Sequence, residues 1–186
     1  PETSVPGYLD LDPVMAQWVQ ALTAALGTPL LVGAPMGRRE GQLWRLTNSA
    51  ALLGAHGAVA QRYDKLHLVP YGEFIPFEFL APWLRSVLPP IGDFVPGNEY
   101  TLFSLGGSGL GAQGSGPSPQ PSAQSPQPRF SVLICFEDIF PELAREFVRR
   151  GARILVTITN DAWFGKTAAA YQHAQASTFR AVELRV

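Results

Sequence analysis

Residues 130–159 read FSVLICFEDIFPELAREFVRRGARILVTIT and set the fold class. The runs from Phe130 to Phe136 and from Ala152 to Thr159 are largely apolar, as is typical of strands buried on both faces. Between them, Pro141 to Arg150 has the spacing of a helix, which Gly151 ends. A strand, a helix and a strand in this order form a βαβ unit. We therefore predict an α/β domain whose sheet is covered by helices.

The amino-terminal half predicts another helix and three more strands. The segment from Asp12 to Gly27 carries apolar residues at helical spacing, behind an N-cap aspartate and an early proline. A short apolar strand is expected from Leu30 to Val32. Two further β-type runs, Leu43 to Leu53 and Ala58 to Lys65, flank a glycine-containing turn. This pair predicts a hairpin.

Two stretches predict little regular structure. Residues 69–96 are rich in proline and aromatic residues and predict an ordered loop, with one short helix near Glu78 to Leu88. Residues 106–128 differ from the rest, because twenty of these twenty-three are Gly, Pro, Ser or Gln and none is charged. Such a segment cannot bury enough apolar surface to offset the entropy lost on ordering. We predict a disordered insertion there.

Composition excludes several classes of function. The chain has 186 residues, of which 46% are hydrophobic, and this is enough for the core of one domain. Fourteen basic and fifteen acidic residues give a net charge of -1, so we expect no nucleic-acid partner. No apolar run approaches the ~18 residues that a membrane span needs, and no secretory signal opens the chain. Because a motif starts at the first residue, we expect a piece of something longer.

Cys135 is the only cysteine, which excludes an intramolecular disulfide and a multi-cysteine metal site. We expect neither a metal nor a cofactor. Cys135 stands at the carboxyl end of a predicted strand, where α/β folds place reacting groups. The carboxylates of Glu137 and Asp138 follow directly, and a closed core rarely tolerates these unpaired. Core filler and nucleophile both remain open as interpretations of Cys135.

The three histidines do not point to a cysteine-histidine pair. His56 is in a turn, and His67, although close to Lys65 in sequence, is better interpreted as structural. His173 lies in a helix-like stretch, where a packed or solvated side chain is expected. A carboxylate base with a lysine can replace histidine in activating a thiol.

Three motifs occur in a fixed order along the chain. They are PETSVP at residues 1–6, YDKLHLVPYGEFIP at 63–76 and LICFE at 133–137. In this order they resemble the nitrilase, or carbon-nitrogen hydrolase, superfamily, whose members use a Glu, a Lys and a Cys on an αββα sandwich. The resemblance implies that residues 1–186 are a partial domain of this fold, truncated at both ends. It implies three catalytic roles: general base for Glu2, oxyanion-stabilising cation for Lys65, and nucleophile for Cys135.

Two features are similar to one branch of that superfamily, the apolipoprotein N-acyltransferases. They are the long form of the lysine motif and the segment TNDAWFG at residues 159–165. The resemblance assigns active-site support to Glu73 and Glu137, and a position near the acyl-chain entrance to Trp163. Phe136 stands beside the nucleophile where many members carry Tyr, so the hydroxyl is absent from this supporting position.

The branch implies a reaction and a location. A fatty acyl chain would pass from a membrane phospholipid, through a cysteine thioester, to the amine of an S-diacylglyceryl-cysteine lipoprotein. The site would face the periplasm at the bacterial inner membrane, with membrane attachment through segments outside this chain. Two alternatives remain: a soluble nitrilase-type amidase, in which water resolves the thioester, and a non-catalytic remnant that binds lipid or protein.

Overall fold

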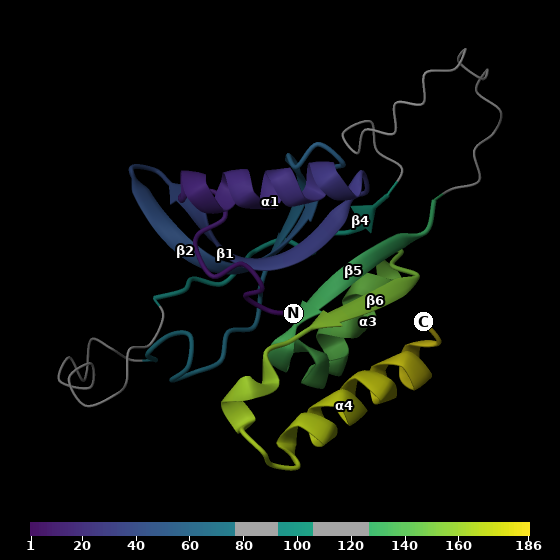
Figure 1. Cartoon of the computed structure of the whole chain (residues 1–186). Coiled ribbons are helices and arrows are strands. Elements are labelled where there is room, and N and C mark those ends of the chain that lie inside the picture. The colour runs from purple at the N-terminus through teal and green to yellow at the C-terminus, as the bar shows by residue number, and fades with distance from the viewer. Residues whose placement is uncertain (77–92, 106–126) are drawn as a thin grey trace, which may run out of the picture.

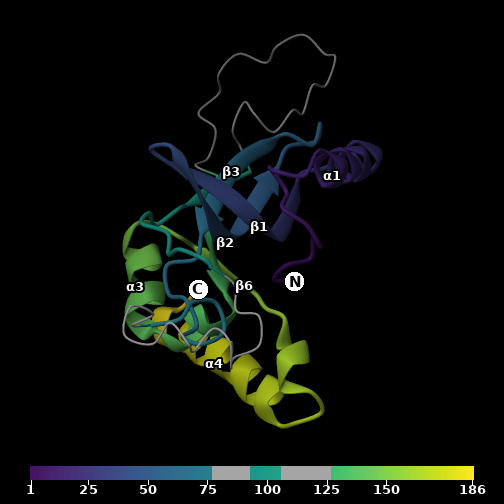
Figure 2. The same cartoon turned by 90° about the vertical axis from the view of Figure 1, so that its left-hand side faces the viewer.

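The computed structural model describes residues 1–76, 93–105 and 127–186. Two three-stranded sheets lie between helix α1 on one side and helices α3 and α4 on the other (Figure 1). The same layers are visible after a quarter turn (Figure 2). This order confirms the expected αββα sandwich. The short helix expected near Glu78 to Leu88 falls outside the described residues, as does nearly all of the predicted insertion at 106–128.

The first sheet is antiparallel and contains β1 (Leu30–Glu40), β2 (Leu43–Leu53) and β3 (Val59–Asp64), in that order. The β2–β3 hairpin was predicted correctly. The prediction that the first strand ends at Val32 was wrong, because β1 continues to Glu40 through Gly33 and Pro35, residues that usually interrupt strands. Pro35 is tolerated because β1 is an edge strand. The outward-facing carbonyl of Pro35 accepts a hydrogen bond from the backbone of Leu9 at 3.1 Å.

Helix α1 (Pro13–Leu26) covers the outer face of the first sheet and matches the prediction. The side chain of Asp12 caps it by accepting hydrogen bonds from Val14 and Met15, and Gly27 ends it with a φ of 62°. Val19 is the most buried apolar residue of the helix. It packs in a cluster with Val32, Ala34, Met36, Ala51 and Leu53 from the sheet.

The second sheet contains β4 (Phe103–Ser104), β5 (Arg129–Ile134) and β6 (Ile154–Ile158). β5 and β6 are parallel and are joined through α3 (Pro141–Arg149), which confirms the βαβ unit. β5 ends at Ile134 and not at Phe136 as predicted, because Cys135 turns the chain into the short 3-10 helix η2 (Cys135–Ile139).

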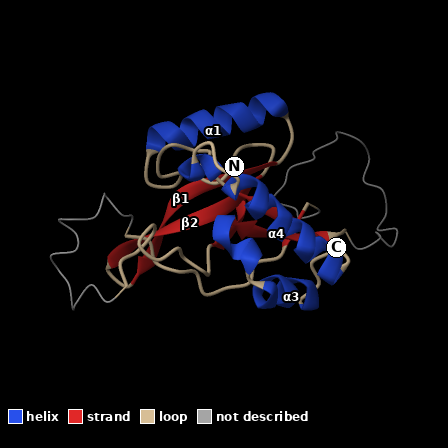
Figure 3. Cartoon of the chain, turned by 90° about the horizontal axis from the view of Figure 1, so that it is seen from below, coloured by secondary structure: helices blue, strands red, loops and turns tan. Residues whose placement is uncertain are grey.

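A second 3-10 helix, η3 (Asp161–Phe164), follows β6 and leads into α4 (Ala169–Leu184). Figure 3 shows α3 and α4 together on the outer face of the second sheet. The core between and beneath the sheets combines Leu52 and Tyr63 with Phe103, Val132, Ile134, Leu143 and Phe147. Among the described helices, none has both the length and the apolar character that crossing a bilayer requires.

Candidate active site

Lys65 is buried between two carboxylates at the end of the first sheet. Its ammonium nitrogen lies 2.9 Å from Oε2 of Glu73 and 3.5 Å from Oε1 of Glu2. Lys65 is 1% exposed, Glu2 8% and Glu73 9%, so water screens these charges little. Burial acts to lower the pKa of Lys65, but attraction to Glu73 and then to Glu2 outweighs it and raises the pKa. The lysine is therefore a fixed cation.

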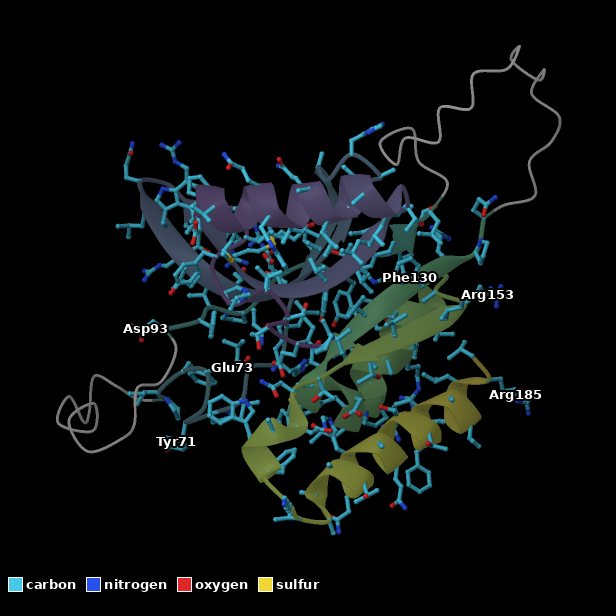
Figure 4. All side chains as sticks on the ribbon, in the orientation of Figure 1. Tyr71, Glu73, Asp93, Phe130, Arg153 and Arg185 are labelled. Carbon is cyan, nitrogen blue, oxygen red and sulfur yellow. The ribbon has the colours of Figure 1, made fainter. Side chains whose placement is uncertain are left out.

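Different segments deliver the two carboxylates. Glu2 is held by the end of β6, because its backbone nitrogen donates to the carbonyl of Thr159 and its Oε2 accepts from the Asn160 nitrogen, both at 3.3 Å. Gly33 allows this approach, since a Cβ there would lie 2.5 Å from the carbonyl oxygen of Pro1. Glu73 lies on the loop after β3 and, unlike the exposed Tyr71 beside it, is turned towards the body of the domain (Figure 4).

Asn48, in the middle of β2, joins the two carboxylates. Its side-chain nitrogen donates to Oε1 of Glu2 at 2.7 Å and to Oε1 of Glu73 at 2.6 Å. Asn48 is not among the residues predicted from the sequence. The run Thr47-Asn48-Ser49 was the available signal, because three consecutive polar side chains are unexpected inside a strand that is otherwise apolar and here are all buried.

Cys135 lies at the junction of β5 and η2 and is half-buried. Its φ of 52° is uncommon for a residue other than glycine, so surrounding contacts must hold the turn. Burial is the largest effect on the thiol and raises its pKa. A hydrogen bond with Thr159 lowers the pKa, the charge of Glu2 raises it and the charge of Lys65 lowers it. The net shift of the pKa is upward. The resting thiol is therefore protonated, and a base must remove the proton.

Glu137 ties the lysine loop to the cysteine turn. It is fully buried, and its Oε1 accepts hydrogen bonds from the Tyr63 hydroxyl and from the backbone nitrogens of Leu66 and His67, at 2.7 to 3.1 Å. Its Oε2 accepts from the nitrogen of Ile134 at 2.8 Å. Burial raises the pKa of Glu137, although these hydrogen bonds lower it. The carboxyl thus links the residue after Lys65 with the residue before Cys135.

The two aromatic residues expected at the site have different surroundings. Phe136 packs edge-on against Phe140, with the ring centroids 5.1 Å apart. Trp163, in η3, is 86% exposed, so it does not pack in the core of the described fold. An exposed tryptophan next to a buried reactive centre is available for contact with a substrate.

The histidines differ from one another more than the sequence suggested. His67 stacks on Phe140 with ring centroids 4.6 Å apart, and burial followed by the charge of Lys65 lowers its pKa. This agrees with a structural role. His173 was expected to be packed or solvated, and its ring in fact contacts the carbonyl of Cys135 and two carboxylates. Among the described residues, no group of histidine, cysteine or acidic side chains has an arrangement suited to a metal.

The chain is similar to known proteins along its whole length. The chain is 40% identical over 186 residues to the apolipoprotein N-acyltransferase of Geobacter metallireducens, and 33% identical over 204 residues to that of Chlorobaculum tepidum. All of this chain aligns in both cases. It covers 32% and 35% of those proteins, so the chain spans about a third of the length of the curated relatives it matches.

Solved structures of the same fold are more distant in sequence. An amidase from Nesterenkonia superposes with a TM-score of 0.55 at 21% identity, covering 96% of this chain and 52% of the amidase. Saccharomyces cerevisiae Nit3, of the nitrilase superfamily, gives a TM-score of 0.56 at 19% identity, covering 92% and 47%. The family model described as carbon-nitrogen hydrolase matches residues 1–186. Since that match spans every residue, the chain belongs to the carbon-nitrogen hydrolase family.

Proposed function

We propose that this chain carries the acyl-transfer site of an apolipoprotein N-acyltransferase. The observation that carries the proposal is the burial of Lys65 between Glu2 and Glu73, beside a cysteine whose thiol is electrostatically coupled to Glu2 and Lys65. The similarity to enzymes named apolipoprotein N-acyltransferase along the whole chain supports this choice of reaction within the family.

In the first half-reaction, Glu2 removes the thiol proton and the thiolate of Cys135 attacks an ester carbonyl of a phospholipid. A carbon-sulfur bond forms and the carbonyl oxygen becomes an oxyanion. The fixed cation of Lys65 stabilises that oxyanion, together with backbone N–H groups. The ester bond then breaks, Glu2 returns its proton to the departing alcohol of the lysophospholipid, and the acyl chain remains on sulfur as a thioester.

In the second half-reaction, the α-amine of an S-diacylglyceryl-cysteine lipoprotein attacks the thioester. Glu2 takes a proton from the amine, and Lys65 again faces the oxyanion. The carbon-sulfur bond breaks, the amide product leaves, and the proton on Glu2 returns to the thiolate of Cys135. Glu73 keeps Lys65 in place and charged throughout, and Glu137 keeps the lysine loop against the cysteine turn.

The acyl donor and acceptor locate the reaction at a membrane. We infer that the site works on the periplasmic side of the bacterial inner membrane, where both lipid substrates are present. Trp163 is the described aromatic residue best suited to contact an acyl chain, because it is exposed and its segment directly follows Asn160, which contacts Glu2.

Intact-protein mass spectrometry tests the acyl-enzyme step. The protein expressed from its complete gene is incubated with phospholipid in detergent, with Cys135→Ser as the matched control. We expect the wild type to carry an adduct of the mass of one acyl chain that hydroxylamine removes. The Cys135→Ser variant should carry no adduct that hydroxylamine removes. If folded protein carries no adduct while small amides are hydrolysed, the amidase alternative replaces the acyltransferase.

A further inference from the structure

His173 is a buried titratable residue that the acyl-transfer steps above do not use. It lies on α4, and its side chain is 9% exposed. Its Nδ1 is 2.8 Å from Oδ1 of Asp161, at the start of η3. Its Nε2 is 3.2 Å from the carbonyl oxygen of Cys135 and 3.1 Å from Oδ1 of Asp138, in η2. Both ring nitrogens therefore face oxygen acceptors.

This arrangement selects the protonated ring. A neutral imidazole donates from one nitrogen only, so its other nitrogen would face a carboxylate or a carbonyl without a proton between them. The fully buried Oδ1 of Asp138 has no hydrogen bond of good geometry among the described residues. Burial raises the pKa of Asp138, and a neighbouring cation acts against this by stabilising the charged carboxylate. An imidazolium donates one hydrogen bond to Asp161 and one to the carbonyl of Cys135, and its positive charge lies 3.1 Å from Oδ1 of Asp138.

The charges around His173 agree with this assignment. Burial acts to lower the pKa of His173, but the hydrogen bond with Asp161 and the charge of Asp138 outweigh it and raise the pKa. Arg180, on the same helix, also interacts with Asp138, but it is paired with Glu183 at 3.2 Å. Of these two cations, the imidazolium is the one that lies 3.1 to 3.2 Å from oxygen atoms of the cysteine turn.

The segment that His173 anchors also contacts the catalytic groups. Asp161 Oδ1 accepts a hydrogen bond from the hydroxyl of Thr159 at 2.9 Å, and the Thr159 side chain interacts with the thiol of Cys135. The same segment holds Glu2 through the Thr159 carbonyl and the Asn160 nitrogen. His173 thus joins the support of the base to the turn of the nucleophile, and that turn has a φ of 52° that needs outside contacts.

We propose that His173 is a positioning residue for acyl transfer, whose imidazolium clamps the Thr159–Asp161 segment to the turn that carries Cys135. The role rests on the proposed function in so far as Cys135 is the nucleophile there. The clamp is closed while the ring is protonated and opens as pH rises through the raised pKa of His173.

Alkylation of Cys135 by iodoacetamide tests the clamp without any lipid. The rate constant is followed against pH by peptide mass spectrometry in the wild type and in His173→Gln, with the exposed histidine variant His56→Gln as control. In the wild type we expect two ionisations in the pH profile. The rate constant should rise as the thiol of Cys135 loses its proton, and a second ionisation should lower it as His173 loses its proton. His173→Gln should lose the second ionisation and react about tenfold more slowly where the wild-type ring is protonated, as expected for one charge-assisted hydrogen bond.

A folded His173→Gln protein with the wild-type rates and the wild-type pH profile would overturn the clamp. If that variant does not fold, Asp161→Asn carries the test, because it keeps the ring and removes one of the charges that raise its pKa. The second ionisation should then move to lower pH, and an unmoved ionisation contradicts the proposal.

The two proposals fail in different ways. If His173→Gln alters alkylation but the wild type forms no acyl adduct with phospholipid, the clamp stands and the acyltransferase assignment does not. If folded His173→Gln forms the acyl adduct at the wild-type rate with an unchanged pH profile, the assignment stands and the clamp is wrong.

Discussion

The side-chain nitrogen of Asn48 lies 2.7 Å from Oε1 of Glu2, a residue 46 positions earlier in the chain. The same nitrogen lies 2.6 Å from Oε1 of Glu73, so one neutral amide donates to both carboxylates that flank Lys65. Two carboxylates around one lysine leave a net negative charge in a buried place, and hydrogen bonds are needed to offset it. The middle of β2 is therefore part of the candidate active site.

Replacing Asn48 with Leu keeps much of the volume and removes both donors. We expect the free energy of unfolding to fall by about 1–3 kcal/mol, because two buried carboxylate oxygens lose a partner. The rate of acyl-enzyme formation should fall at least tenfold, since Glu2 loses its shortest side-chain hydrogen bond. Urea denaturation and mass spectrometry measure the two effects, with the exposed Asn98→Leu as control. An active, fully stable Asn48→Leu protein contradicts this role.

Linear motifs revealed the charged part of the site but not its neutral part. Glu2, Lys65 and Glu73 stand in ordered motifs with their own spacing, so their meeting could be expected. Asn48 has no such motif, because its role depends on the register of β2 against segments 46 residues before it and 25 residues after it. The partners of His173 could not be predicted for the same reason, since they come from η2 and η3 and only the tertiary fold brings them to α4.

The fold was easier to predict where the spacing of the apolar residues and the residues that cap an element indicated the same helix or strand. Helix α1 has an aspartate cap and a terminal glycine, and its limits were predicted closely. Strand β1 was predicted too short, because Gly33 and Pro35 weaken the local pattern while pairing with β2 extends the strand to Glu40. The turn at Cys135 also had no local signal, because its positive φ is accompanied by a contact from His173 on α4, 38 residues later in the chain.

Lys65→Met should make stability depend on pH in a new way. The variant leaves Glu2 and Glu73 buried without their cation, which at neutral pH should cost about 3–5 kcal/mol of unfolding free energy. As pH falls, protonation of one carboxylate removes one of the two negative charges, so the deficit in unfolding free energy relative to the wild type should shrink. Denaturation at several pH values, with the exposed Lys166→Met as control, measures this. A deficit that is constant with pH excludes an electrostatic origin.

Glu137→Gln should lower stability most at low pH. The amide keeps one acceptor but turns a donor towards the nitrogen of Ile134, so about 1–3 kcal/mol should be lost. In the wild type, burial raises the folded pKa of Glu137 above the value of about 4.3 in an unfolded chain. A raised carboxyl pKa contributes stability that is complete below the unfolded pKa and is lost as pH rises through the folded one. The stability gap between the two proteins should therefore narrow as pH rises.

The measurement for Glu137→Gln is the free energy of unfolding from urea titrations across that range of pH. Glu99→Gln, which changes an exposed carboxyl, should follow the wild type at every pH. A gap that widens as pH rises means that the buried carboxyl is ionised below the unfolded pKa. Hydrogen bonds from Tyr63, Leu66 and His67 would then outweigh its burial.

Trp163→Ala should separate acyl-chain recognition from chemistry. Because Trp163 is 86% exposed, its loss should change the free energy of unfolding by no more than about 0.5 kcal/mol. Alkylation of Cys135 by iodoacetamide should be unchanged, whereas acyl-enzyme formation from a long-chain phospholipid should require more lipid to reach half its maximal rate. Trp18→Ala on α1, where the ring is 60% exposed, is the matched control and should leave both reactions unchanged. If Trp163→Ala slows iodoacetamide as much as phospholipid, the tryptophan supports the cysteine turn and does not contact the acyl chain.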